Sequence, residues 1–422
     1  MRLSELRALA RLHDIQLSYE DATGKRREAS PDALEAILKV RMERRALSPP
    51  APIHVVWDAS IPHGYHDIDG TFVICAPRRA HPLGGRTWGL FVPLYATRED
   101  ATLRDLDAWR SWVQELGGGA IATLPLLAAM PEERSPYSPD SRLFWNDRYL
   151  DTEDTQPVPA VADEELVRYA QFRERRGDGP ASRHIDAQLR IAQQMRRLAA
   201  RGGLYLDFPL GVHPGGYDVW RYADSFAKGV SVGAPPDAFF TKGQNWGFPP
   251  LDPDAIRANR YEYFRACIRH HMQHASILRL DHVMGLHRLY WIPEGAEAKD
   301  GVYVRYRDEE LFAIIALESQ LHGCAVVGED LGTVPEYVPR AMQRHGLRRM
   351  FVVQYEAKPE GIGDPPRMSV ASVNTHDMPT FAAFERGLDI DDRVEQGLLD
   401  EEGARKEREA RARIREVVGS LE

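Results

Sequence analysis

Three apolar runs in this chain each end in a carboxylate, and no other pattern in the sequence says more about its fold. The runs lie within residues 277–292, 325–332 and 368–377. Their carboxylates are Asp281, Glu329 and Asp377, each 48 residues from the next. Aliphatic and β-branched runs of this kind are typical of strands buried in a parallel sheet. Because the carboxyl ends of barrel strands carry the active site, the pattern predicts three buried strands with candidate catalytic groups at their tips.

The length of 422 residues suits a (β/α)8 barrel with insertions and a small additional region. Helical segments, such as 105–116, alternate with seven strand-like segments. In chain order these segments lie at 88–95, 120–127, 203–212, within 277–292, and at 325–330, 349–355 and 368–377. No eighth strand is recognisable after residue 377, where the sequence becomes charged and helix-prone. We therefore predict an α/β fold, a (β/α)8 TIM-type barrel that lacks its C-terminal closing strand.

The first 80 residues are predicted to form a small N-terminal appendage of helices and short β segments. Its second helix should begin at Pro31, with Ser30 as the N-cap residue. The run S-P-P-A-P at 48–52 breaks any helix and is typical of a linker. No function for this region follows from its sequence.

Residues 81–422 are predicted to form the catalytic barrel. An irregular insertion at about 213–260, rich in Gly, Pro and aromatic residues, interrupts it between the third and fourth strands. Loops of this length inside a compact domain are usually functional, so we expect the insertion to contact the substrate.

Composition excludes several classes of function. A formal net charge of −9 makes a nucleic-acid partner unlikely to bind and suits a neutral polar substrate. No run approaches the roughly 20 apolar residues that span a membrane. The three cysteines show no metal-binding or redox spacing and indicate a reducing, cytoplasmic environment. No Cys/His cluster or Gly-rich phosphate loop is present, so we expect no cofactor and no metal.

The strand-tip motifs R-L-D-H, G-E-D-L-G and N-T-H-D closely resemble those of the 4-α-glucanotransferases, or amylomaltases, of the α-amylase superfamily. The resemblance covers roughly residues 60–415. It implies that Asp281 is the nucleophile, that Glu329 is the acid/base residue, and that Asp377 stabilises the sugar at the cleavage point.

The chemistry that the resemblance implies is double displacement with retention. Asp281 would form a covalent glycosyl-aspartate, and Glu329 would protonate the leaving oxygen and then activate the acceptor hydroxyl. Segments of α-1,4-glucan (maltooligosaccharides) would thereby be transferred to acceptor glucans or glucose. Glu329 must be protonated near neutral pH, and the neighbouring charge of Asp281 should raise its pKa.

Further positions match the family's substrate-binding segments. They are Tyr137 in S-P-Y-S-P-D-S-R, Arg279 in R-L-D-H, His376 in N-T-H-D, and Gln244 and Trp246 in G-Q-N-W-G. Tyr137 would stack under the sugar, and Arg279 should keep Asp281 ionised through a charge-assisted bond. A contact of Asp207 with sugar is left open, and Asp330 is expected to point outward or to cap a turn.

Two other functions remain open at this point. An α-glucan hydrolase could use the same scaffold and would convert maltotriose only to shorter sugars. A glucan-binding or inactive form would bind maltooligosaccharides without turnover. The oligomeric state, the preferred chain length, and whether the sequence is C-terminally truncated do not follow from the residues.

Overall fold

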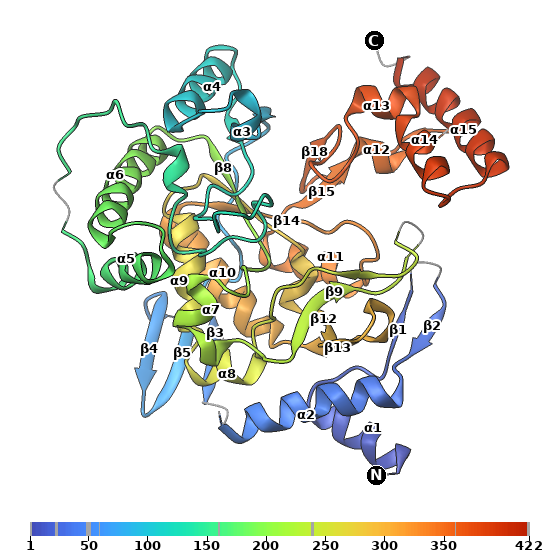
Figure 1. The fold of residues 1–422 in the computed structure, drawn as a ribbon, viewed down its shortest axis with the longest axis horizontal. Helices are drawn as coiled ribbons and strands as arrows, with labels where there is room; N and C mark the ends of the chain where they lie inside the picture. The colour runs from blue at the N-terminus through green and yellow to red at the C-terminus, as the bar shows by residue number, and fades with distance from the viewer. Residues whose placement is uncertain are drawn as a thin grey trace. The chain divides into compact units, whose positions relative to one another are not determined.

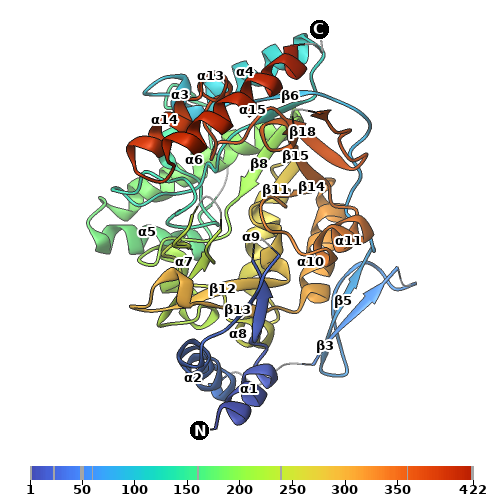
Figure 2. The same ribbon diagram turned by 90° about the vertical axis from the view of Figure 1, so that its right-hand side faces the viewer.

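The computed structural model describes residues 2–21, 24–47, 52–58, 60–158, 161–237, 240–358 and 360–419. The chain divides into two compact units, Met1–Leu347 and Arg348–Glu422, which are described separately. Figure 1 and Figure 2 show their helices and strands from two directions. Among the described residues, no helix is long and apolar enough to cross a membrane.

A five-stranded parallel sheet is the centre of the first unit, with strand order β14-β11-β8-β7-β6. Its members are β6 (Gly89–Phe91), β7 (Ala120–Ala122), β8 (Leu204–Phe208), β11 (Ile277–Leu280) and β14 (Ala325–Gly328). Every residue of β11 and β14 is buried, which explains their nearly unbroken apolar sequences. The first five predicted strands are therefore confirmed, and each is shorter than its apolar run.

Helices connect the parallel strands, as a right-handed α/β fold requires. They are α3 (Leu94–Thr97), α4 (Leu103–Glu115), α5 (Glu164–Arg176), α6 (Ala181–Ala200), α8 (Pro253–Ala258), α9 (Glu262–Met272), α10 (Asp308–His322) and α11 (Tyr337–His345). In Figure 2, α9 lies beside β8 and β11, against which it packs. Gly202 and Gly203 follow α6 with φ of +73° and +82°, a left-handed conformation that ends the helix as predicted.

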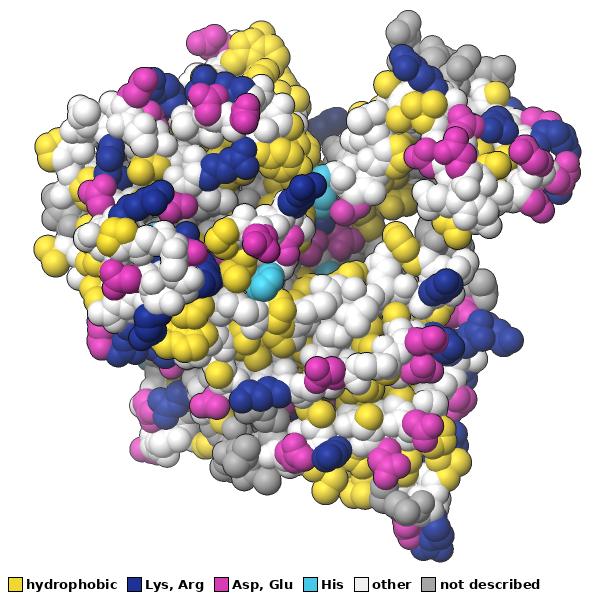
Figure 3. All heavy atoms as spheres, viewed as in Figure 1, with side chains coloured by type: hydrophobic (Ala, Val, Ile, Leu, Met, Phe, Trp, Pro, Cys, Tyr) yellow, Lys and Arg dark blue, Asp and Glu magenta, His cyan; other side chains and the backbone are white. Residues whose placement is uncertain are grey.

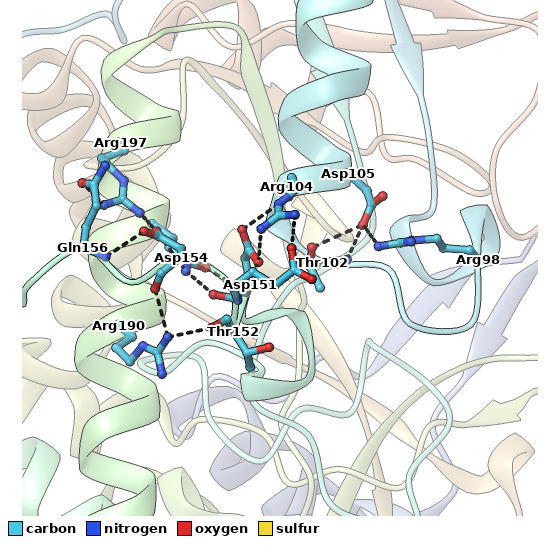
Figure 4. Close-up of polar contacts among 12 residues, drawn as sticks. Arg98, Thr102, Arg104, Asp105, Asp151, Thr152, Asp154, Gln156, Arg190 and Arg197 are labelled. Atoms are coloured by element: carbon cyan, nitrogen blue, oxygen red, sulfur yellow. Dashed lines mark hydrogen bonds and ion pairs between the residues drawn. The ribbon is translucent and has the colours of Figure 1, made fainter.

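The long connection between β7 and β8 is held to the helices by arginines (Figure 4). Arg104 of α4 donates to both carboxylate oxygens of Asp151, at 2.9 and 2.8 Å. Arg190 of α6 donates to the main-chain oxygen of Asp154 at 3.0 Å, and Arg197 pairs with the carboxylate of Asp154. These contacts fix the connection on the outer surface of the sheet's helices.

The N-terminal region packs within the first unit. It comprises α1 (Leu3–Leu12), the hairpin of β1 (Ser18–Glu20) and β2 (Arg26–Glu28), α2 (Pro31–Leu47), and a sheet of β3 (Ile53–Trp57), β5 (Thr71–Ala76) and β4 (Gly64–Ile68). Ser30 Oγ accepts from the Ala33 N–H at 3.1 Å, which confirms the predicted N-cap. Most of the predicted linker, residues 48–51, lies outside the described residues. The boundary near residue 80 stays a prediction.

A fully buried ion-pair cluster joins this N-terminal region to α8. Arg41 of α2 donates to Asp252 at 2.9 Å and to Asp254 at 2.8 Å, and none of the three side chains is more than 5% exposed. Removal of one partner from such a cluster leaves a buried charge uncompensated, so α2 is an integral part of the unit.

The prediction of an irregular insertion at about 213–260 was wrong for much of its length. The segment contains α7 (Tyr217–Arg221), β9 (Val230–Ala234), β10 (Gln244–Asn245) and α8. β9 and β10 belong to a four-stranded antiparallel sheet, β10-β9-β12-β13, with β12 (Arg288–Pro293) and β13 (Val302–Arg305). The stretch 277–292 therefore contains two strands that lie in two different sheets.

The second unit contains the two remaining predicted strands, β15 (Arg349–Val352) and β18 (Ser369–Ser372), as a parallel pair in which Arg349 is opposite Ser369. Around them lie α12 (Val353–Glu356), a hairpin of β16 (Ala357–Lys358) and β17 (Gly361–Ile362), α13 (Phe381–Arg386), α14 (Leu388–Glu395) and α15 (Glu401–Gly419). α15 confirms the helical character expected of the charged C-terminal segment. Whether the strands form a closed barrel stays a prediction.

Candidate active site

The sheet register brings Asp281 and Glu329 next to each other. Leu280, the last residue of β11, is paired with Gly328, the last residue of β14, and each carboxylate residue follows directly. Adjacent strands lie about 4.8 Å apart, so the two residues leave the sheet side by side. The Glu329 N–H donates to the Leu280 oxygen at 2.9 Å, and the Asp281 N–H donates to the Phe208 oxygen at 3.1 Å. The predicted strand-tip positions of both carboxylates are confirmed.

Arg279 is the central cation of this site. Its Nη1 lies 2.9 Å from Oδ1 of Asp281 and 2.8 Å from Oδ1 of Asp207. Burial opposes the charge of this guanidinium, but Asp207 and Asp281 raise the pKa of Arg279 well above its ordinary value. Arg279 is therefore a permanent cation that favours the ionised form of both partners, as the sequence predicted for Asp281.

Asp207 acquires a role that its sequence left open. It is paired with Arg279 in the register of β8 and β11, and it is only 4% exposed. Besides the bonds to Arg279, it accepts a hydrogen bond from the hydroxyl of Tyr137. Asp207 thus holds the arginine from the strand opposite the nucleophile and also anchors Tyr137.

Two main-chain N–H groups hold the carboxylate of Glu329. His282 N–H donates to Oε2 at 2.9 Å, and Leu331 N–H donates to Oε1 at 2.7 Å. Desolvation raises the pKa of Glu329 to about 7, and the charge of Asp281 adds to the rise, whereas Arg279 and the two N–H groups oppose it. A carboxyl group with this pKa can donate and accept a proton near neutral pH.

The residues of the G-Q-N-W-G segment reach this site through a ring contact. The Trp246 indole N–H donates to Oε1 of Gln244 at 2.9 Å. The Trp246 ring meets the His282 imidazole nearly edge-on, with centroids 5.3 Å apart. The structure therefore brings Gln244 and Trp246 together with Asp281, Glu329, Arg279 and Tyr137 in the first unit. Asp330, which follows Glu329, is buried rather than pointing outward.

The other two predicted site residues, His376 and Asp377, lie in the second unit after β18. His376 Nε2 is 3.2 Å from Oδ2 of Asp377, whose side chain is 71% exposed. Each unit is described by itself, so the role of this pair beside Asp281 and Glu329 stays a prediction.

A cavity of about 70 Å3 borders Asp281 and His282. Its other lining residues are largely apolar and include Phe208, Phe248 and Leu289. Ligand pockets usually measure several hundred Å3, whereas this volume corresponds to about two water molecules. It is a packing defect behind the strand tips and not a site for a sugar.

Among the described residues, no group of three or more His, Cys, Asp and Glu side chains is arranged to hold a metal ion. The polar groups that do gather are a cation, three carboxylates and a phenol, supplied by Arg279, Asp207, Asp281, Glu329 and Tyr137. Acidic and basic side chains are interspersed over the molecular face in Figure 3, in keeping with a substrate without charge.

Sequence reasoning missed the contribution of His282. Its φ of +46° and ψ of +64° place it in the left-handed region, which costs a residue other than Gly roughly 1–2 kcal/mol. No local signal in the sequence marks this conformation, because neither Gly nor Asn occupies the position. Only its place directly after the candidate nucleophile could have drawn attention to it.

The chain is similar to known α-glucan enzymes. A 4-alpha-glucanotransferase from Mycobacterium tuberculosis is 32% identical over 433 residues, covering 75% of this chain and 60% of the relative. A 4-alpha-glucanotransferase from Haemophilus influenzae is 40% identical over 204 residues, covering 47% of this chain and 29% of the relative. The chain thus spans about 60% of the length of the mycobacterial relative.

Two solved structures share the fold. The amylomaltase from Corynebacterium glutamicum has a TM-score of 0.83 at 22% identity, covering all of this chain and 86% of that one. The amylomaltase from Streptococcus agalactiae, in complex with acarbose, has a TM-score of 0.62 at 17% identity, covering 74% of this chain and 83% of that one. A family model described as 4-alpha-glucanotransferase matches residues 181–420, more than half of the chain. The chain therefore belongs to the 4-alpha-glucanotransferase family.

Proposed function

We propose that this protein is a retaining 4-alpha-glucanotransferase that moves α-1,4-glucan segments to acceptor glucans or glucose. Asp281 attacks the anomeric carbon and expels the leaving glucan, whose oxygen takes the proton of Glu329. The 4-hydroxyl of an acceptor then attacks the glycosyl-aspartate, and Glu329 recovers a proton from that hydroxyl. The bond formed replaces the bond broken, so the number of α-1,4 bonds is unchanged.

The observation that carries this proposal is the different electrostatic environment of two adjacent carboxylates. Asp281 shares Arg279 as a partner at 2.9 Å, which suits an ionised nucleophile. Desolvation raises the pKa of Glu329 to about 7, which suits a residue that must alternate between acid and base. Neighbouring titratable groups whose surroundings separate their protonation states are a common arrangement for acid/base catalysis.

The remaining roles rest on the family resemblance together with the local geometry. Tyr137, whose hydroxyl is bonded to Asp207, supplies an aromatic face beside Arg279 for the sugar at the cleavage point. Gln244 and Trp246 serve the acceptor side. His376 and Asp377 hold hydroxyl groups of the distorted sugar. We further propose that the enzyme works in the cytoplasm, which is supported by three free, buried cysteines.

The proposal is tested with maltotriose as the only substrate. We expect glucose and a ladder of longer maltooligosaccharides by chromatography, with no net gain in reducing ends. Exclusive formation of glucose and maltose, with one new reducing end for each bond cut, would instead identify a hydrolase. Binding of maltotriose in a calorimeter without any product would identify a binding protein.

The residue assignments are tested by Asp281→Asn and Glu329→Gln, each of which should lower the transfer rate by several orders of magnitude. Glu336→Gln is the matched control, because that carboxylate is 87% exposed and pairs only with the neighbouring Arg340 in its helix. It should leave the rate unchanged. If either site variant kept more than about a tenth of the wild-type rate, equivalent to about 1.4 kcal/mol, its assignment would be wrong.

A further inference from the structure

His282 adopts a main-chain conformation that its residue type disfavours. Its φ of +46° lies in the left-handed region, which Gly and Asn enter readily and most other residues avoid. Strained residues of this kind persist only where their surroundings impose the conformation. Directly before His282 is Asp281, the proposed nucleophile, and directly after it begins the short helix η3 (Val283–Leu286).

The left-handed turn aims consecutive main-chain donors at Glu329. The His282 N–H donates to Oε2 of the Glu329 side chain at 2.9 Å. The next N–H, that of Val283, donates to the main-chain oxygen of Glu329 at 2.9 Å. The residue on β14 is therefore gripped twice by the segment that follows β11.

Trp246 holds the side chain of the strained residue. Its ring meets the His282 imidazole at 5.3 Å with an interplanar angle of 75°. Trp246 is itself fixed, because its main-chain N–H donates to the Val232 oxygen of β9 at 2.9 Å and its indole N–H donates to Gln244. Its other neighbour is Phe248, which stacks on it with centroids 6.1 Å apart.

We propose that His282 is a positioning residue for Glu329, with its left-handed main chain presenting one of the two N–H donors of that carboxylate and with Trp246 holding the imidazole in place. The geometry stands by itself, whereas its catalytic meaning rests on the proposed function. The G-Q-N-W-G segment then acts on the acid/base residue through His282, in addition to any contact that it makes with a glucan.

The expected consequence is a change in the proton affinity of Glu329. A hydrogen bond donated to a carboxylate favours its ionised form, so loss of the His282 donor should raise the pKa of Glu329 further. The charged groups facing Glu329 are Arg279 and Asp281 of the neighbouring strand, and both stay in place when residue 282 is replaced. The shift should be about one pH unit, comparable to the effect of one charge-assisted hydrogen bond.

The test compares His282→Val with His282→Asn. Both replacements remove the imidazole, its titration and its contact with Trp246, but only Asn tolerates the left-handed conformation. The protonation of Glu329 is followed by infrared difference titration of the full chain, with the band assigned by its loss in Glu329→Gln. We expect the midpoint of the Val variant to lie about one pH unit above that of the Asn variant. Equal midpoints would overturn the proposal.

A second pair keeps the question open to decision if the Val variant does not fold. His282→Ala and His282→Gly differ in the same way, because Gly enters the left-handed region without cost and Ala does not. The Ala variant should titrate at the higher pH. Trp246→Ala should shift the midpoint in the same direction, and Trp246→Phe, which keeps a ring against the imidazole, should shift it less. Unchanged midpoints in Ala and Gly variants alike would also overturn the proposal.

Failure of this proposal and failure of the proposed function give different results. The infrared midpoint does not depend on turnover, so it is measured even if maltotriose is not converted. Midpoints that separate as expected in a protein without transfer activity would leave the positioning role intact and refute the function. In an active enzyme, the basic limb of the kcat/KM profile should move with the infrared midpoint, which a merely structural effect on the rate would not produce.

Discussion

Replacement of Glu329 by Gln should remove a specific pH dependence from the stability of the first unit. The pKa of Glu329 lies at about 7 in the folded protein, against an ordinary value of 4.5, because its carboxyl is desolvated beside Asp281. The folded state therefore binds this proton more tightly than the unfolded state. Its contribution to stability is complete below about pH 4.5 and is lost as the pH rises through 7.

The size of the effect follows from the two pKa values. At 1.36 kcal/mol for each pKa unit, the free energy of unfolding should fall by about 3 kcal/mol across this range because of Glu329 alone. Gln cannot titrate and should not show this fall. It does place an NH2 group against one of the two N–H donors from His282 and Leu331, but that cost is the same at every pH.

The assay is urea unfolding of the wild type and of Glu329→Gln at about pH 5 and about pH 8.5, followed by tryptophan fluorescence. All eight tryptophans lie before residue 348, so fluorescence reports on the first unit. The stability of the variant relative to the wild type should rise by most of the 3 kcal/mol between the two pH values. Every other titrating group is shared and cancels in the comparison.

A relative stability that is the same at both pH values would refute this reasoning. It would mean that Glu329 titrates in the folded protein as it does in the unfolded chain, and that the acid/base assignment lacks its electrostatic basis. Glu336→Gln, whose carboxylate is exposed, serves as the control and should show no such change.

Three further predictions concern the supports of the fold and site. Arg41→Met should lower the free energy of unfolding by about 3–5 kcal/mol in urea titrations, because it leaves the carboxylates of Asp252 and Asp254 buried without their cation. Ser30→Ala should cost about 1 kcal/mol by the same measurement, whereas Ser30→Asp, which keeps a capping oxygen, should cost almost nothing. Tyr137→Phe removes the hydroxyl bonded to buried Asp207 and should cost about 1–3 kcal/mol, with KM for maltotriose changing less than in Tyr137→Ala.

The sequence located the parallel strands and two of the three carboxylates correctly for a simple physical reason. A strand buried on both faces must be apolar along its length, so a charged residue directly after it marks its end. The ion pair between Arg279 and Asp281 was equally accessible, since residues two apart on a strand share a face. The motif spacing of Asp377 identified it as a family match, but its partners depend on tertiary placement.

Other features depended on pairings that lie far apart in the sequence. β9 is paired with β12, some 60 residues later, and neither run has the regular alternation that would reveal a strand by itself. Asp207 meets Arg279 only because of the register between β8 and β11, which a single sequence does not specify. The left-handed conformation of His282 is imposed by contacts with Trp246 and Glu329 rather than by local preference.

The antiparallel sheet sets the boundaries within which this enzyme can be recombined with its relatives. Tyr290 to Pro293 of β12 pair with Gly233 to Val230 of β9, and β9 carries the segment that leads to Gln244. A chimera that exchanged residues 217–252 alone would place a foreign strand against a native one and mismatch their side chains. Exchange of 217–252 together with 288–305 would transfer the whole sheet as one cassette. Grafts of acceptor specificity should therefore be designed as two-segment exchanges across the nucleophile strand.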